Sequence, residues 1–372
     1  MRALFVYAYP LIFDAKSADR ARMRAYARAI GELHVLSALP YAHEEQDGNL
    51  HLHGVATGRL GRPRALKKRA RELIDQYAID VVSAQDPFEE GWAAMKAARA
   101  TGTKLHVQLH TDPLSPWYVH TGNARMSFIN HIRRRLADRV LPAADGIRTV
   151  STRVKRSLEE RYGTRIQEPS IIPIVVDLES PPAEPLPAHS FSFALIAVSR
   201  IEPEKRIKDI FAALARVVAR YPRTGLFIVG DGRERSQLEH LARKLGIEKN
   251  VVFLGERTAY QARAFMQSAD AFIQASAFEG YGMTFIEAAL AKLPLIVTDV
   301  GMAGDILKHE ENALVAPVAD PAALARHITT LIEDNRLRSQ LALAAESSAR
   351  AHLAAEGDHP ARVAADLARL VS

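Results

Sequence analysis

Short apolar runs rich in Val and Ile alternate along this chain with segments whose apolar residues recur at helical spacing. Strands of this kind, joined by crossover helices, form parallel sheets that helices cover. The runs lie at 3–7, 33–37, 81–84, 105–109, 146–150, 170–174, 193–198, 226–229, 251–254, 271–274, 295–297 and 313–316. The alternation therefore predicts an α/β fold with doubly wound parallel sheets.

A proline-rich segment divides this alternation into two halves. Residues 180–187 hold four prolines in eight positions, which excludes a helix or a central strand and predicts a stiff linker. A chain of 372 residues also exceeds what one hydrophobic core usually organises. We therefore predict a first domain over 1–178, a linker over 179–190, a second domain over 191–350 and a helical tail over 351–372.

The composition excludes several classes of function. The chain has no cysteine, which removes disulfides, cysteine-ligated metals and thiol nucleophiles and fits a reducing compartment. No run reaches the 18 apolar residues of a spanning helix, and we interpret residues 3–13 as a first core strand rather than a signal segment. The expected location is cytoplasmic, with peripheral attachment to the cytoplasmic face of a membrane as an option.

The basic residues are unevenly distributed. Residues 1–178 carry 27 Lys and Arg against 19 Asp and Glu, whereas the remainder carries 22 against 24. The asymmetry suggests an anionic partner for the first half, such as a lipid surface, a phosphorylated acceptor or nucleic acid. Two basic stretches, 59–71 and 126–140, fit either an amphipathic membrane contact or a solvated helix face. No aromatic RNA-binding motif is present, so we do not expect a nucleic-acid partner.

The segment 278–288, with the sequence Phe-Glu-Gly-Tyr-Gly-Met-Thr-Phe-Ile-Glu-Ala, combines a glycine turn with a predicted helix start near Thr284. Free N–H groups at a helix start, approached closely through glycine, suit a phosphate. The carboxylates of Glu279 and Glu287 would accept hydrogen bonds from sugar or ribose hydroxyls. Thr284 and Glu287 also match a capping box, so a structural role for Glu287 is equally open.

The segment 198–205, with the sequence Val-Ser-Arg-Ile-Glu-Pro-Glu-Lys, runs from a predicted strand into a loop before a helix. Arg200 and Lys205 could both reach a diphosphate, and such cations suit a leaving group whose charge grows as its bond breaks. The alternative is a surface arginine paired with Glu202 or Glu204. A third motif, Val229-Gly230-Asp231-Gly232, lacks the last glycine of the dinucleotide-binding fingerprint. P-loop, HExxH, GxSxG and calcium-loop patterns are also absent.

These motifs occur in an order that resembles the retaining family 4 glycosyltransferases of GT-B fold (glycosyl transferases group 1). The series adds Val251-Val252-Phe253-Leu254-Gly255, the E-x7-E spacing of Glu279 and Glu287, and the segments 300–305 and 312–324. The resemblance implies two facing Rossmann-like domains with a cleft between them. It also implies a hexosyltransferase that uses a UDP-sugar or GDP-sugar donor and a saccharide or lipid-linked acceptor in glycoconjugate synthesis, with no cofactor and no metal.

The resemblance also implies roles for particular residues. Arg200 and Lys205 would bind the diphosphate, Glu287 the ribose diol and Glu279 the donor sugar. The backbone of Gly282, Met283 and Thr284 would lie near the sugar and phosphates, and that of Gly255, Glu256 and Arg257 would hold the base. His110, after the predicted strand 105–109, would contact a sugar hydroxyl, although a strand-end histidine alone is more often packed.

The first half matches the family only in outline. Tyr9-Pro10 replaces a glycine pair, residues 172–177 lack the usual Asn-Gly, and Arg206 stands where glycine usually follows the lysine. Candidate acceptor contacts are Gln85, Asp86, Asp112, Trp117 and Tyr118; the alternative for Trp117 and Tyr118 is packing on the next helix. Two other functions remain open: a related GT-B enzyme such as a nucleotide-sugar 2-epimerase, and a non-catalytic sugar-nucleotide binding protein.

Overall fold

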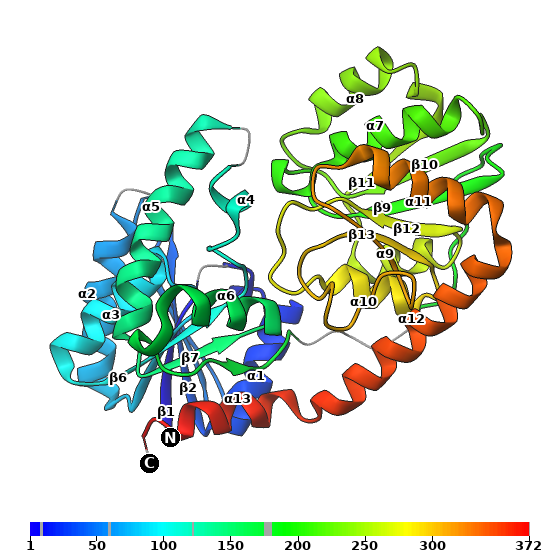
Figure 1. Ribbon diagram of the computed structural model, residues 1–372. Helices are drawn as coiled ribbons and strands as arrows, with labels where there is room; N and C mark the ends of the chain where they lie inside the picture. Colours follow the sequence, from blue (N-terminus) through cyan, green and yellow to red (C-terminus); the bar gives the residue numbers. More distant parts are fainter. Residues whose placement is uncertain (8–9, 59–60, 121–122, 175–180, 372) are drawn as a thin grey trace. The chain divides into compact units, whose positions relative to one another are not determined.

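The computed structural model describes residues 1–7, 10–58, 61–120, 123–174 and 181–371, which form two compact units (Figure 1). Unit 1 comprises Met1–Ser115, Arg125–Pro173 and Glu356–Ser372. Unit 2 comprises Pro116–Ala124 and Ile174–Ala355. Each unit is built on one mainly parallel sheet, so the prediction of two Rossmann-like α/β domains is confirmed.

The sheet of unit 1 has eight strands in the order β3-β4-β2-β1-β5-β6-β7-β8, and only β3 runs antiparallel to its neighbour. The strands are β1 (Arg2–Val6), β2 (Glu32–Leu39), β3 (His43–Asp47), β4 (Leu50–Ala56), β5 (Val81–Ala84), β6 (Lys104–Leu109), β7 (Gly146–Thr149) and β8 (Ser170–Ile171). The helices are α1 (Ala18–Ile30), α2 (Arg62–Tyr77), α3 (Glu89–Thr101), α5 (Ala124–Val140), α6 (Thr152–Tyr162) and α13 (His359–Ala368). Six of these strands correspond to the six predicted in the first half.

The hairpin of β3 and β4 is not predicted by the apolar pattern of the sequence. The sequence of β3 is His-Glu-Glu-Gln-Asp, which has no apolar residue, because β3 is an edge strand with alternating half-buried and exposed side chains. In β4 leucine and histidine alternate, and the leucines pack in the core of the sheet face that α1 covers. Gly48, at φ 63°, lies in the turn between the two strands. Apolar periodicity alone could not identify so polar an edge.

The two faces of this sheet are covered by different helices (Figure 1). Alternate residues of the central strands, including Ala3, Phe5, Leu33 and Val35, pack against α1 and against Val363 of α13. The intervening residues point to the opposite face because successive side chains of a strand alternate. Helices α2 and α3 pack on each other and cover that second face.

The sheet of unit 2 has six parallel strands in the order β11-β10-β9-β12-β13-β14. They are β9 (Phe193–Val198), β10 (Thr224–Val229), β11 (Val251–Gly255), β12 (Ala271–Gln274), β13 (Leu295–Thr298) and β14 (Leu314–Ala316). The helices are α4 (Pro116–Val119), α7 (Ile207–Val218), α8 (Arg235–Lys244), α9 (Ala259–Met266), α10 (Met283–Leu290), α11 (Pro321–Glu333) and α12 (Asn335–Glu356). All six strands predicted in the second half are present. β9, β10, β12 and β13 are buried apolar runs, whereas the edge strand β11 is mostly half-buried.

The described part of the predicted linker 179–190 begins at residue 181, and residues 179–180 lie outside the described residues. As predicted, residues 181–186 form neither helix nor strand. Their backbone is held by unit 2: Gln267 Nε2 donates to the Pro181 carbonyl at 2.5 Å, and Ser268 Oγ donates to the Glu184 carbonyl at 2.8 Å. This part of the linker is therefore anchored to unit 2.

The C-terminal boundary differs from the predicted one at 350/351, which falls inside α12. The chain passes from unit 2 into unit 1 at Glu356, the last residue of α12. Because α12 is one continuous helix of 22 residues, no loop or change in composition marks the predicted position. The tail helix α13 then packs on α1. Among the described helices, none is both long and apolar enough to span a bilayer.

Candidate functional site

The residues predicted to bind the donor in unit 2 follow the carboxyl ends of adjacent parallel strands. Arg200 and Lys205 follow β9, Glu279 follows β12, and Gly255 ends β11. Because parallel strands end at the same edge of their sheet, these residues share the edge at which ligands of doubly wound folds bind. The loops are also joined directly, since the Ala277 N–H donates to the Glu204 carbonyl at 2.7 Å.

Lys205 and Glu279 form the centre of this edge. The Lys205 Nζ lies 2.5 Å from Glu279 Oε1, and only 14% and 15% of the two side chains are exposed. Gln274 Nε2 and Ser276 Oγ donate to the same oxygen, each at 2.7 Å. Three donors thus fix the carboxylate through Oε1, and no described residue donates to Oε2.

Gln274 and Ser276 are not among the site residues predicted from the sequence. Gln274 is the last residue of β12 and is buried, and its Oε1 accepts from Thr284 Oγ1 at 2.9 Å. Buried polar side chains require hydrogen-bond partners, so a glutamine at the end of an apolar strand was the signal that could have identified this network.

Helix α10 begins one residue before the predicted start. Its N-cap is Gly282, at φ 96°, and no side chain caps the first turn. A Cβ on Gly282 would lie 2.7 Å from Cδ2 of Phe285, so the turn requires glycine both for its φ and for space. The first N–H groups of a helix have no intrahelical acceptors, which leaves those near Met283 and Thr284 for an anion.

The capping-box hypothesis for Thr284 and Glu287 is wrong. Thr284 is the second residue of α10 rather than its N-cap, and its hydroxyl donates to Gln274. Glu287 instead pairs with Arg263 of α9, whose Nη1 lies 3.5 Å from Glu287 Oε1. The two side chains are 12% and 8% exposed. The ribose-binding role of Glu287 stays a prediction.

Arg200 makes the ion pair that the alternative hypothesis predicted. Its Nη2 lies 3.1 Å from Glu204 Oε1, and 73% of its side chain is exposed. Glu202 pairs instead with Arg233, at 2.7 Å. The high exposure of Arg200 leaves its guanidinium accessible to a ligand. The role of Arg200 in binding the diphosphate stays a prediction.

Close packing between two loops explains why the motif 229–232 contains two glycines, although it does not match the dinucleotide fingerprint. A Cβ on Gly230 would lie 2.0 Å from the Ser199 carbonyl oxygen, and one on Gly232 would lie 2.4 Å from the Ile201 carbonyl oxygen. The Ile201 N–H also donates to the Asp231 carbonyl at 2.9 Å. The glycines therefore let the loop after β10 pack directly on the loop that carries Arg200.

The predicted base-binding segment lies beside these loops. Gly255 adopts φ 71°, and its carbonyl accepts from the Gly230 N–H at 2.8 Å. Glu256 and Arg257 are exposed in the loop between β11 and α9. The carbonyls of Gly255 and Glu256 thus already accept hydrogen bonds, from Gly230 and from the Arg257 side chain, and the base-binding assignment stays a prediction.

His110 belongs to unit 1, where it follows the carboxyl end of β6 as predicted. Burial, followed by the charges of Arg148, Arg22 and His359, lowers the pKa of His110 to about 3. The imidazole is therefore neutral at physiological pH and can hydrogen-bond a hydroxyl without adding charge. Its contact with a donor sugar stays a prediction.

Two acceptor candidates of unit 1 have internal roles. Asp112 is buried and accepts hydrogen bonds from the Leu114 N–H and Ser157 Oγ, both at 2.9 Å. Asp86 accepts from the Phe88 N–H at 2.7 Å, and burial, with the nearby Glu90 carboxylate, raises the pKa of Asp86. Asp112 thus fixes a turn, whereas Asp86 favours the protonated form.

Trp117 and Tyr118 lie on α4, in unit 2. The Arg206 guanidinium lies 5.1 Å from the centroid of the Trp117 ring, and Tyr118 contacts Phe278 edge-on at 5.3 Å. Arg206 adopts φ 48°, a left-handed backbone conformation that glycine adopts more easily than other residues. This conformation explains why glycine is favourable at the position after Lys205. Both aromatic residues therefore contact loops that also carry Lys205 and Glu279.

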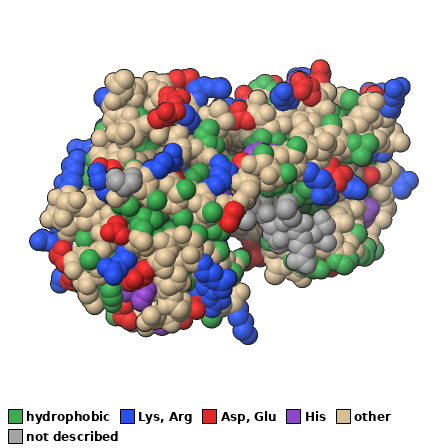
Figure 2. Space-filling model, turned by 90° about the horizontal axis from the view of Figure 1, so that it is seen from below, with side chains coloured by type: hydrophobic (Ala, Val, Ile, Leu, Met, Phe, Trp, Pro, Cys, Tyr) green, Lys and Arg blue, Asp and Glu red, His purple; other side chains and the backbone are tan. Residues whose placement is uncertain are grey.

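The predicted basic stretches are partly neutralised. In the first, Arg62 pairs with Glu90, and Arg69 pairs with Glu44 and Glu72. On the face of the molecule seen in Figure 2, basic side chains are interspersed with acidic and apolar ones. The second stretch forms most of α5, on which Phe128 and Ile132 are 66% and 43% exposed.

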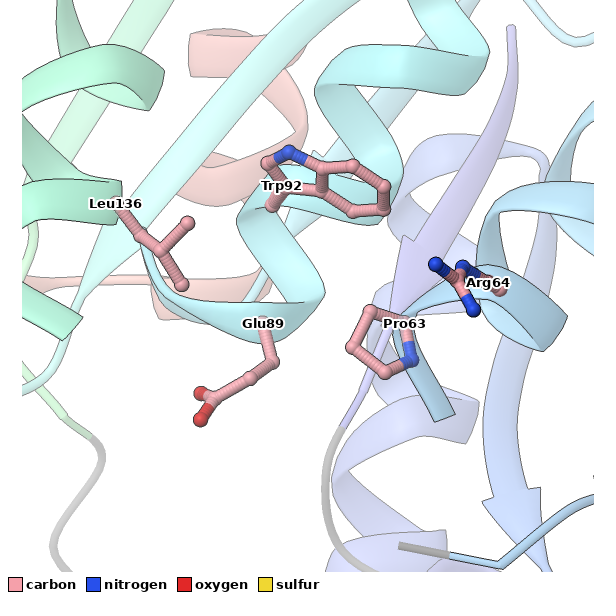
Figure 3. A pocket seen from close by; sticks show the side chains of 5 residues that line it. All are labelled: Pro63, Arg64, Glu89, Trp92 and Leu136. Atoms are coloured by element: carbon pink, nitrogen blue, oxygen red, sulfur yellow. The ribbon is translucent and has the colours of Figure 1, made fainter. Parts of the chain in front are cut away.

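Unit 1 contains a pocket of about 300 Å³ that the sequence analysis did not predict. Its lining side chains come from the first turns of α2 and α3 and from α5, and they are Pro63, Arg64, Glu89, Trp92 and Leu136 (Figure 3). Helices α2 and α3 follow β4 and β5, so the pocket lies at the carboxyl edge of this sheet. Its mixture of an indole, a proline and opposite charges suits a polar ligand with an apolar face.

Comparison with known proteins gives two family matches. Residues 188–348 match the family described as Glycosyl transferases group 1, and residues 23–180 match Glycosyltransferase Family 4. The chain is 27% identical to a glycogen synthase of Mycobacterium tuberculosis over 54% of this chain and 49% of that protein. It is 27% identical to the alpha-monoglucosyldiacylglycerol synthase of Streptococcus pneumoniae over 61% and 54%.

Solved structures share the fold over nearly the whole chain. A sucrose-phosphate synthase of Thermosynechococcus elongatus superimposes with a TM-score of 0.79 at 18% identity, covering 99% of this chain and 98% of that one. The Anabaena protein HepE, solved in complex with UDP-glucose, gives a TM-score of 0.74 at 20% identity, covering 99% and 100%. By contrast, the chain spans about half the length of the curated relatives it matches. The two adjoining family matches and the GT-B architecture together show that this chain belongs to the family 4 glycosyltransferases of GT-B fold.

Proposed function

We propose that this protein transfers a hexose from a UDP-sugar or GDP-sugar to an acceptor hydroxyl, with retention of anomeric configuration and without a metal ion. The observation that carries the proposal is the carboxyl edge of the unit 2 sheet. There a lysine, an oriented carboxylate and an uncapped helix start converge. The family match and the UDP-glucose bound by HepE support a nucleotide-sugar donor.

The donor would use hydrogen-bonding capacity that remains at Lys205, Glu279 and the start of α10. A lysine ammonium has three N–H donors, so Lys205 can keep its bond to Glu279 and still donate to a phosphate. Glu279 Oε2 can accept from a sugar hydroxyl while its Oε1 stays fixed by Gln274 and Ser276. The first N–H groups of α10 would bind phosphate or sugar oxygens.

Catalysis would then consist chiefly of stabilising the departing diphosphate. As the anomeric bond stretches, negative charge develops on the leaving oxygen, and Lys205, Arg200 and the helix start oppose that charge. The acceptor hydroxyl attacks from the same face and passes its proton to the leaving phosphate oxygen. The anomeric carbon thus exchanges its bond to the phosphate oxygen for a bond to the acceptor oxygen, and no protein base is required.

The acceptor in this proposal is a saccharide or a lipid-linked acceptor, within glycoconjugate synthesis. The Trp92 pocket of unit 1 can accommodate the apolar face of a sugar ring, with Arg64 and Glu89 bonding its hydroxyls. For a lipid-linked acceptor, Phe128 and Ile132 on the basic helix α5 are available to contact an anionic bilayer. Binding to phosphatidylglycerol vesicles that Phe128→Ser with Ile132→Ser abolishes would support peripheral attachment.

The proposal is tested by incubating the protein with UDP-sugars and GDP-sugars and with candidate acceptors. Release of UDP or GDP that depends on both sugar and acceptor, with the product anomer assigned by NMR, is the expected result. Free UDP with an epimerised sugar and no acceptor dependence would identify a 2-epimerase instead. A melting temperature raised by the nucleotide sugar with no turnover would identify a binding protein.

A further inference from the structure

Three histidines lie together on the unit 1 sheet, away from the residues assigned above. His34 of β2 pairs in register with His51 of β4, and the next pair on the same face is Leu36 with His53. His34 and His53 are buried, and 17% of the His51 side chain is exposed. Two carboxylates flank them, Glu32 and Glu44. Because leucine and histidine alternate at positions 50–53, the histidines of β4 share the face opposite to the core leucines.

These groups form a chain of contacts that lacks one proton. His34 Nε2 lies 2.9 Å from Glu32 Oε1, His34 Nδ1 lies 3.0 Å from His53 Nε2, and His53 Nδ1 contacts Glu44. The carboxylates at both ends only accept, so each of the three contacts needs a ring N–H, whereas two neutral imidazoles supply two. One contact therefore needs an additional proton or a metal ion.

The third histidine indicates where a metal ion would lie. His51 Nε2 is 3.8 Å from the same Glu32 Oε1, and the ligand atoms of Glu32, His34 and His51 all lie within 4.8 Å of one another. In a tetrahedral zinc site with bonds of about 2.0–2.2 Å, neighbouring ligand atoms lie about 3.3–3.5 Å apart. A proton between Glu32 and His34 would not account for a second imidazole directed at the same oxygen.

The surroundings hold two of these ligands in place. If His34 binds a metal through Nε2, its Nδ1–H donates to His53, whose own N–H donates to Glu44. Glu44 in turn accepts from Arg69 at 2.8 Å, and Glu32 Oε2 pairs with Arg2 at 3.3 Å. Metal-bound histidines typically donate their other N–H to such a relay, which fixes the tautomer and orients the ring.

We propose that Glu32, His34 and His51 form a binding site for a divalent cation of the zinc class, with the remaining position open to solvent. Two imidazoles and one carboxylate are a donor set that suits such borderline metals better than Mg²⁺ or Ca²⁺. The rings of His34 and His51 are stacked at 4.5 Å and 10°. Binding therefore requires His51, which borders solvent, to tilt out of the stack.

The site lies near the amino ends of β2 and β4, since Glu32 begins β2 and His51 is the second residue of β4. Ligands of doubly wound sheets bind at the carboxyl ends, so this cation would stabilise unit 1 and would not act in sugar transfer. Bound metal would join β2 to β4, which carries the edge hairpin. The inference does not depend on the proposed transferase activity.

The test is isothermal titration calorimetry of the full chain, treated with EDTA and dialysed, with ZnCl₂ at pH 7.5. We expect one Zn²⁺ per chain and a melting temperature that rises with Zn²⁺ but not with Mg²⁺. His51→Ala and Glu32→Gln should each weaken binding by at least about 10-fold, and Glu44→Ala, which removes the acceptor at the end of the relay, by about 10- to 100-fold. His240→Ala, at an exposed position of α8, is the matched control and should bind as the wild type does.

Two results would overturn the proposal. If Zn²⁺ produces neither binding heat nor stabilisation, a proton rather than a metal ion completes the Glu32–His34 contact. If His51→Ala binds Zn²⁺ as tightly as the wild type, the ion lies at another site. Both readouts are independent of glycosyl transfer, so they hold whichever donor the protein uses.

Discussion

The Lys205 ammonium and the Glu279 carboxylate, separated by 2.5 Å, form an ion pair at the carboxyl edge of the unit 2 sheet. The family resemblance assigns the lysine to the diphosphate and the glutamate to the sugar. Their pairing holds both groups in place and neutralises both charges. Preorganised charges of this kind need no rearrangement when the leaving group departs.

Replacing Lys205 by alanine should lower donor turnover by at least ~10-fold, which corresponds to about 1.4 kcal/mol of transition-state stabilisation. The reason is that the departing diphosphate loses its most buried cation. Initial rates of UDP or GDP release measure the effect. The control is Lys249→Ala, because Lys249 is exposed at the amino end of β11. Equal rates for Lys205→Ala and wild type would refute the role of Lys205.

Glu287→Ala should also lower donor turnover by at least ~10-fold, through loss of hydrogen bonds to the ribose hydroxyls. Calorimetric titration with the nucleotide product and with its 2′,3′-dideoxy analogue separates this role from the ion pair with Arg263. Wild type should prefer the nucleotide with both hydroxyls, whereas Glu287→Ala should bind the two equally. A preference that persists in the variant would assign Glu287 to structure alone.

Gly282→Ala should destabilise unit 2 by about 1–3 kcal/mol, because alanine must adopt φ 96° and its Cβ meets the Phe285 ring at 2.7 Å. Gly246→Ala is the matched control: Gly246 also has a positive φ, 69°, but open space at the Cβ position. Urea unfolding of both variants measures the difference. If Gly246→Ala costs as much as Gly282→Ala, the contact with Phe285 contributes nothing.

Trp117 and Arg206 should be energetically coupled by about 0.5–2 kcal/mol through their cation–π contact. A double-mutant cycle of Trp117→Ala and Arg206→Ala in urea unfolding measures this coupling. Arg206 also donates to Asp209 at 2.6 Å, so the single Arg206 variant should cost more than the coupling alone. Strictly additive effects would show that α4 and the loop after β9 are independent.

The stability of unit 1 should fall as the pH is lowered from 6.5 towards 4, partly through His359. Burial and the neighbouring charge of Arg148 lower the pKa of His359 to about 4, from an ordinary value of 6.5. The native state holds this imidazole neutral while the unfolded chain takes up a proton, so stability is complete above pH 6.5 and declines below it. At pH 5 the loss from this group is about 2 kcal/mol.

Urea unfolding at pH 7 and pH 5 of the wild type, His359→Gln and His240→Ala checks this prediction. His359→Gln should lose less stability between the two pH values than the wild type, because its side chain takes up no proton. His240 is exposed, and its replacement should leave the pH dependence unchanged. An equal loss in His359→Gln would show that other groups account for the acid sensitivity.

Local sequence patterns predict the two parallel sheets and the edge where the candidate site lies. Each central strand is a buried run of Val, Ile or Leu, and the residues that follow β9 and β12 carry the polar groups, so local patterns located Lys205 and Glu279. The β3–β4 hairpin was missed because an edge strand need not be apolar.

Which charged side chains pair depends on the packing of the folded chain. Lys205 and Glu279 are 74 residues apart and meet because the sheet aligns the ends of β9 and β12. Glu287 is 24 residues from Arg263 and meets it because α10 contacts α9. The same applies to His34 and His51, which β2 and β4 bring into register. Hydrophobic periodicity fixes the face on which a side chain lies, whereas its partner across the sheet depends on strand order and register, which local patterns do not encode.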